Sequence, residues 1–145
     1  MKIDKILMTI LMLTLLFTLS YAGEKKDIVE AVKVNKIAEL LDLDEGLISQ
    51  LIKVESKLKK MQKDFEKSED SLIGKLEKSI EDKNYEKTDE IIDSLENLER
   101  RKLDESLKIK RDYAKKLSKE KRAKYFLYEI KFKNTLKNKI IEKIK

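Results

Sequence analysis

The sequence predicts an all-α fold, and its composition carries that prediction. The 145 residues include no proline and 3 glycines, so the residues that punctuate sandwiches, barrels and loop-rich folds are scarce. Charged residues make up 43% of the chain and hydrophobic residues 41%, a balance typical of long amphipathic helices. A chain of this length has room for one domain, so we expect a single helical domain with much of its surface in water.

The composition also restricts the chemistry open to this chain. It contains no cysteine and no histidine. Without cysteine there is no disulfide, thiol nucleophile or iron-sulfur site, and without histidine the commonest metal ligand and general base is missing. The sequence therefore predicts a binding protein and not an enzyme, with no cofactor and no metal site.

The first 22 residues have the order of an export signal. Two lysines precede an apolar run from Ile6 to Leu19, and Ser20-Tyr21-Ala22 offers small residues for cleavage. The run falls short of the roughly 17 to 25 apolar residues that cross a bilayer, so we expect cleavage and not retention as an anchor. The predicted division is a signal peptide at 1–22 and one exported domain at 23–145. Export also argues against nucleic acid as a partner.

Four helices are expected in the exported domain. The first covers Asp27–Leu41, where apolar residues have a mostly helical spacing behind an acidic first turn. Asp44 is placed to accept hydrogen bonds from the backbone N–H groups that open a second helix, from about Glu45 to Asp82. Apolar residues that recur every seven positions are typical of a coiled-coil seam, and in this helix they are Leu51, Leu58, Phe65 and Leu72.

The chain is expected to fold back at Asp82–Tyr85, because Asn and Asp side chains cap locally and no apolar period continues there. A third helix, from about Glu86 to Lys116, has a second apolar stripe that can cover the first if the two helices are antiparallel. Ser118 is the expected N-cap of a fourth helix, which has Glu120 in its first turn. The core is then a long helical hairpin with shorter flanking helices.

Charge is unevenly distributed along this hairpin. Residues 68–107 carry 13 acidic and 7 basic side chains, whereas residues 108–124 carry 9 basic and 2 acidic ones. Because the chain turns near Asn84, the acidic stretch surrounds the tip of the hairpin and the basic stretch lies at its base. Opposite charges four residues apart are expected to form solvated pairs on exposed helix faces, among them Glu55 with Lys59 and Glu129 with Lys133.

The basic stretch and the aromatic residues after it form the candidate binding site. Basic side chains attract acidic partners and mainly raise the association rate, and aromatic side chains on one helix face can then hold a client. The sequence leaves three alternatives open: an ordinary solvated surface, aromatic packing onto a neighbouring helix, and binding of anionic lipid headgroups. The predicted client-binding residues are Lys108, Arg111, Lys115, Lys116, Lys119, Arg122, Tyr125, Tyr128 and Phe132.

Two stretches resemble the Leu-Thr-x-x-Gln motif that the Spy/CpxP family of periplasmic stress proteins carries at helix starts. The better copy begins Leu117-Ser118 and ends at Lys121, so Ser replaces Thr and Lys replaces Gln. The earlier copy begins Leu43-Asp44, and only the Leu and a capping residue remain. The turn near Asn84 also falls where the family has its inter-helix turn. The resemblance extends over nearly the whole exported domain.

The resemblance implies a curved, antiparallel helical homodimer in the periplasm. The concave face of such a protein binds non-native proteins without ATP, or binds the periplasmic domain of a membrane stress sensor. The zinc binding of some relatives does not carry over, because this chain has no histidine or cysteine. The leading prediction is a periplasmic ATP-independent chaperone or stress-sensor adaptor. A secreted coiled-coil structural or adhesin-like protein is the alternative that the seam favours.

Overall fold

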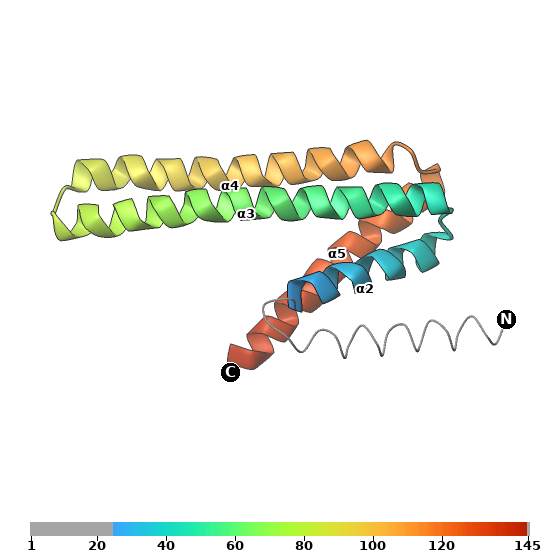
Figure 1. Cartoon of the computed structure of the whole chain (residues 1–145). Helices are drawn as coiled ribbons and strands as arrows, with labels where there is room; N and C mark the ends of the chain where they lie inside the picture. The colour runs from blue at the N-terminus through green and yellow to red at the C-terminus, as the bar shows by residue number, and fades with distance from the viewer. Residues whose placement is uncertain (1–24, 145) are drawn as a thin grey trace.

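The computed structural model describes residues 25–144, and these form four helices joined by short turns (Figure 1). There is no strand in this part of the chain, so the predicted all-α fold with four helices is confirmed. The predicted signal peptide and its cleavage site lie outside the described residues. The helices are α2 (Lys25–Leu41), α3 (Glu45–Glu81), α4 (Tyr85–Ala114) and α5 (Lys119–Ile144).

Side-chain caps determine where the last three helices begin. Asp44 accepts a hydrogen bond of 2.8 Å from the backbone N–H three residues later, at the start of α3. Asn84 does the same for α4 at 3.2 Å, and Ser118 for α5 at 3.3 Å. Each cap satisfies a backbone N–H group that the first helical turn leaves without a partner. The predicted capping roles of Asp44 and Ser118 are confirmed.

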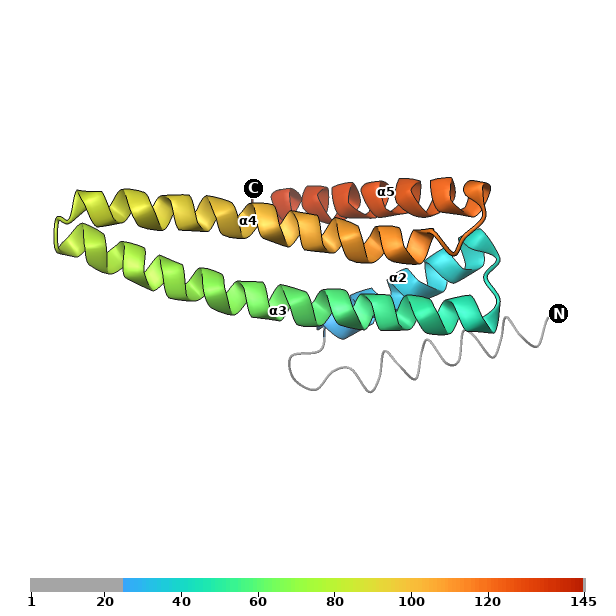
Figure 2. The ribbon, with the colours of Figure 1, turned by 90° about the horizontal axis from the view of Figure 1, so that it is seen from above.

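Helices α3 and α4 form the long antiparallel hairpin that the sequence predicts (Figures 1 and 2). Its tip is the turn between Glu81 and Tyr85, where Lys83 has a left-handed φ of 53°. Within the predicted seam of α3, Leu51 and Phe65 are buried, whereas Leu58 and Leu72 are half-buried. Burial therefore alternates along the seam, and it continues into the tip half, where Ile91 and Leu98 on α4 are buried.

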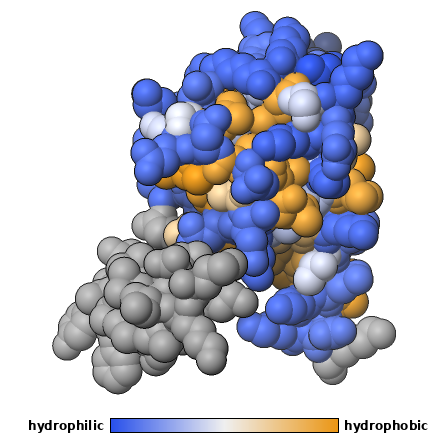
Figure 3. All heavy atoms as spheres, turned by 90° about the vertical axis from the view of Figure 1, so that its right-hand side faces the viewer, coloured by the Kyte–Doolittle hydropathy of each residue, from blue (hydrophilic) through white to orange (hydrophobic). Residues whose placement is uncertain are grey.

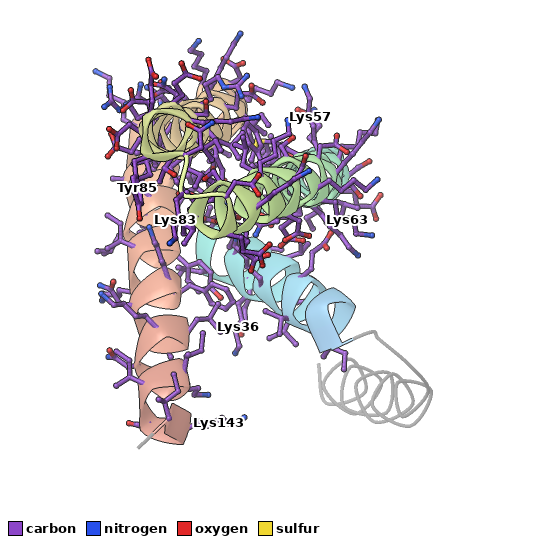
Figure 4. All side chains as sticks on the ribbon, turned by 90° about the vertical axis from the view of Figure 1, so that its left-hand side faces the viewer. Lys36, Lys57, Lys63, Lys83, Tyr85 and Lys143 are labelled. Carbon is purple, nitrogen blue, oxygen red and sulfur yellow. The ribbon has the colours of Figure 1, made fainter. Side chains whose placement is uncertain are left out.

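Helices α2 and α5 pack beneath the base half of the hairpin. They lie close together at the base and diverge toward their free ends, so that Figure 4 shows them splayed below α3 and α4. The main core lies where the four helices meet, which leaves the tip half as a two-helix structure. The buried residues of this core are Val34, Ile37, Leu41, Leu43, Leu51, Tyr113, Ala114, Leu117 and Tyr125.

Candidate functional site

A buried ion network lies at the centre of the base, and each helix contributes one charged side chain to it. Lys33 Nζ on α2 lies 3.0 Å from Glu55 Oε1 on α3 and 2.7 Å from Glu129 Oε1 on α5. Lys110 Nζ on α4 lies 2.6 Å from Glu129 Oε2. The side chains of Lys33, Glu55 and Glu129 are 11%, 8% and 9% exposed. The network therefore fixes the register of all four helices in one place.

Two members of the network have shifted pKa values. Burial alone raises the pKa of the Glu129 carboxyl, but the neighbouring Lys33 and Lys110 ammonium groups outweigh burial and hold that pKa below its usual range. Burial alone lowers the pKa of Lys33, and the carboxylates of Glu55 and Glu129 outweigh it and raise that pKa. The network therefore favours the charged forms of both groups.

The network corrects one sequence-based expectation. Glu55 and Glu129 were expected to form solvated pairs with lysines four residues later on the same helix, and that expectation is wrong. Both carboxylates point inward and pair with Lys33 from another helix. Lys59 Nζ instead lies 3.8 Å from Glu30 Oε2 on α2. Pairing across helices becomes possible because α2 and α5, which carry Lys33 and Glu129, pack against the side of the hairpin that carries Glu55 and Lys110.

The predicted aromatic residues lie on the inner side of α5. Tyr125 is fully buried, and its ring packs edge-on against Tyr113 with centroids 5.5 Å apart. The Tyr113 hydroxyl donates a hydrogen bond of 3.2 Å to the carbonyl of Leu47, and burial raises the pKa of Tyr113 to about 12. The Tyr125 hydroxyl has no hydrogen-bond partner among residues 25–144. Tyr125 therefore belongs to the core, as the packing alternative expects, and is not presented to a client in this arrangement.

Tyr128 and Phe132 keep part of their surface exposed. Their rings stack with centroids 5.8 Å apart, and Lys33 Nζ lies 5.8 Å from the Phe132 centroid. Phe132 also lines a hollow of about 290 Å³ between α2, α3 and α4, together with Leu58 and Met61. These two rings therefore lie beside the ion network, at the edge of the core.

The two copies of the motif meet in space at the base of the bundle. Leu43 and Leu117 are both buried in the main core. Lys121, which occupies the Gln position, donates a hydrogen bond of 2.7 Å from its Nζ to the carbonyl of Asp42. Asp42 has a left-handed φ of 47° directly after α2, where the chain leaves the helix. Lys121 thereby joins the start of α5 to the end of α2.

The predicted basic residues fall into two groups. Arg122 donates through Nε to the carbonyl of Ala114 at 3.1 Å, so it has a structural partner. Lys110, which lies in the same basic stretch but is not among the predicted residues, belongs to the ion network. The remaining members project from the end of α4, the following turn and the start of α5. With Lys124 added, these exposed residues, which we call the basic end, are Lys108, Arg111, Lys115, Lys116, Lys119 and Lys124. Two of them pair with a neighbouring carboxylate: Lys115 Nζ lies 3.1 Å from Asp112, and Lys124 Nζ lies 2.5 Å from Glu120.

The basic end is accompanied by exposed apolar surface. Figure 3 looks at the base of the bundle and shows hydrophobic residues surrounded by hydrophilic ones. Leu40, in the last turn of α2, is 51% exposed, and Leu127, near the start of α5, is 52% exposed. Exposed apolar surface at this end therefore includes leucines, which were not among the predicted client-binding residues.

A second surface, which the sequence did not predict, lies on the tip half of the hairpin. The direction in which its apolar side chains point can be worked out from the ion network by counting helical turns along α3 and α4. Ile73 lies 18 positions after Glu55, and Ile92 lies 18 positions before Lys110. Because 18 residues make five full helical turns, both isoleucines point to the side on which α2 and α5 pack. Neither helix reaches them, and each isoleucine is 41% exposed.

We call this surface the tip face. Its exposed apolar residues are Ile73, Ile80, Tyr85, Ile92 and Leu103. Ile73 lines an open hollow of about 620 Å³, whose lining also includes Glu69, Glu96, Glu99 and Arg100. The sequence placed Ile92 and Leu103 in the apolar stripe of the third helix that was expected to cover the second helix. They face instead the side of the hairpin on which α2 and α5 pack, and this direction depends on the tertiary arrangement and not on the local sequence.

Other kinds of site find no support in the described residues. None of the four helices is both long enough and apolar enough to cross a membrane. Within residues 25–144, acidic side chains do not gather into a group of three or more that could hold a metal ion. No family model matches this sequence, and no curated protein or solved structure matches it either.

Proposed function

We propose that this protein is a periplasmic, ATP-independent chaperone or stress-sensor adaptor that binds non-native or acidic protein surfaces at its basic end. The observation that carries the proposal is the combination, at one end of the bundle, of six exposed basic side chains with exposed leucines. Positive charge attracts an acidic chain from a distance, and apolar contact then slows its release. The resemblance to the Spy/CpxP family supports the same function.

The architecture also supports a binding role. The described part of the chain has a small core at the base, while many large apolar side chains remain exposed on α3, α4 and α5. Soluble proteins rarely expose so much apolar surface unless it contacts a partner. The hollows of about 390 Å³ and 620 Å³ on the described helices are open to solvent, as suits contact with a protein surface.

The proposal is tested by suppression of aggregation without ATP. The purified protein is mixed with an acidic client diluted from denaturant, and light scattering follows aggregation. The triple variant Lys115→Glu, Lys116→Glu, Lys119→Glu is expected to capture the client more slowly. Capture by the parent is expected to slow as salt shortens the Debye length from about 10 Å at 0.1 M to about 3 Å at 1 M.

A matched control separates local charge from net charge. The triple variant Lys67→Glu, Lys75→Glu, Lys78→Glu changes the net charge equally, and all three residues are exposed on the tip half of α3, away from the basic end. It is expected to retain most of the capture rate. Equal loss in both variants would reject the basic end as the binding surface. Concentration-dependent filaments, with no effect on aggregation of the client, would favour the structural coiled-coil alternative.

A further inference from the structure

The charge of the tip face is opposite to that of the basic end. Helical geometry at 100° per residue places five glutamates within about 50° of the direction set by Ile73 and Ile92. The same sector of the tip half contains no lysine or arginine. Arg100 and Lys102 lie just outside it, where the Arg100 guanidinium is 3.9 Å from Glu96 and Lys102 Nζ is 3.8 Å from Glu99. The five glutamates are Glu66, Glu69, Glu77, Glu96 and Glu99.

We propose that the tip face is a second binding surface, which takes a basic amphipathic segment of a partner protein. The isoleucines and Tyr85 offer apolar contact along the middle of the surface, and the glutamates beside them attract lysine or arginine. From Tyr85 to Leu103 the surface is about 27 Å long, because a helix rises about 1.5 Å per residue. That length fits a helical segment of about 18 residues.

The chemistry of the surface distinguishes between possible occupants. Nucleic acid and anionic membranes are repelled by the glutamates. A second copy of this chain offers α5 as a basic helix, but the lysines of α5 are not separated from its apolar face. Lys137 lies within about 40° of both Ile130 and Ile141 around the helix. An occupant with lysines on one face and leucines on the other fits the tip face better. The inference goes beyond the proposed function, since it concerns another surface and basic partners.

The test uses two synthetic probes in fluorescence anisotropy titrations with the purified protein. One is an 18-residue peptide with leucine and lysine on opposite helix faces, and its twin has glutamate at each lysine position. The lysine peptide is expected to bind the parent at least about tenfold more tightly than the twin does. The variant Glu69→Lys, Glu96→Lys, Glu99→Lys is expected to lose this preference or reverse it. The pair Ile73→Ala, Ile92→Ala is expected to weaken binding of the lysine peptide.

The control variant changes three acidic residues on the outer side of α4, Glu90→Lys, Asp93→Lys and Asp104→Lys. All three are exposed, lie roughly 100° to 160° from the tip face, and give the same change in net charge. Binding of the lysine peptide is expected to stay within about threefold of the parent. Circular dichroism confirms that each variant is folded.

Three results would overturn the proposal. They are no binding of the lysine peptide by the parent, equal loss in the tip variant and the control variant, and a parent dimer that the tip variant dissociates while the peptide fails to bind. The last result would assign the tip face to a second copy. The aggregation assay with an acidic client tests the basic end, whereas the peptide titration tests the tip face. Failure of the proposed function in the first assay therefore does not affect the result of the second.

Discussion

Lys33 Nζ lies 2.7 Å from Glu129 Oε1, and this contact joins α2 to α5 near the centre of the bundle. The same ammonium group lies 3.0 Å from Glu55 on α3. One lysine therefore holds two buried carboxylates from two helices. Removing it would leave Glu55 without its ion-pair partner and Glu129 with Lys110 alone, which costs more than the loss of an exposed ion pair.

The variant Lys33→Met is expected to lose about 3 kcal/mol of unfolding free energy, because breaking a buried ion pair leaves an uncompensated charge. Urea unfolding followed by circular dichroism measures the loss. The matched control is Lys36→Met, one turn away on α2, where the exposed Lys36 lies 3.9 Å from Glu39. The control is expected to unfold at nearly the parent's urea concentration. Similar losses of unfolding free energy in both variants would show that the buried network stabilises the fold no more than an exposed ion pair does.

Stability is expected to fall at acid pH because of Glu129. Its folded pKa lies below the ordinary value of 4.5, so the stability it contributes is complete above about that pH and is lost as pH falls through the folded pKa. For Lys33 the dependence of stability on pH is the reverse, and it is expected at alkaline pH. Its folded pKa lies above 10.5, so its contribution is complete below that pH and is lost as pH rises through the folded pKa.

Melting temperatures across the pH range test this expectation against the variant Glu129→Gln. The difference in stability between parent and variant is expected to be constant between roughly pH 5 and 10 and to shrink at acid pH. A difference that stays constant down to the lowest pH at which the parent folds would contradict the lowered pKa of Glu129.

The hydrogen bond from Lys121 to Asp42 is expected to stabilise the packing of α5 on α2. The variant Lys121→Met should lose about 1 kcal/mol of unfolding free energy, because the hydrogen bond from the ammonium group to the Asp42 carbonyl is lost. The control Lys119→Met removes an exposed lysine two positions earlier. Thermal unfolding of the two variants should therefore separate them; identical melting temperatures would show that the contact adds no stability.

Gly74 offers a stabilising change. It lies inside α3, and a Cβ atom built on it meets no other atom within 4 Å. Alanine there is expected to add about 0.5 to 1 kcal/mol to the unfolding free energy, since it reduces the freedom of the unfolded chain. At Gly46 the added Cβ would lie 3.3 Å from Asp44 Oδ1, the oxygen that caps α3. Gly46→Ala should consequently gain less, and a larger gain there than at Gly74 would contradict this account.

The parts of the fold that local chemistry determines were predictable from the sequence. Asp44 and Ser118 cap helices because each side chain needs only the backbone three residues away. The turn near Asn84 follows from the same kind of local bonding. The four helices and the hairpin follow from these boundaries together with the apolar period.

The candidate site was predictable only in part. The basic end follows from the sequence because exposed lysines need no partner. Glu55 and Glu129 look like solvated surface residues, since each has a lysine four positions later. Their burial depends on which faces α2 and α5 cover, and no local pattern contains that information. The burial of Tyr125 and the exposure of Ile73 depend on the same choice of faces.

The position of α2 beside α5 has a consequence for the order of folding. Lys33 and Glu129 are 96 positions apart in the chain, whereas the α3–α4 hairpin closes between neighbouring helices. Contacts between distant positions pay a larger loop-closure entropy and form late. The hairpin can therefore assemble first and serve as the template on which the first and last helices of the described chain dock together. Hydrogen exchange at backbone amides would then show α2 and α5 opening as one unit while the hairpin stays protected.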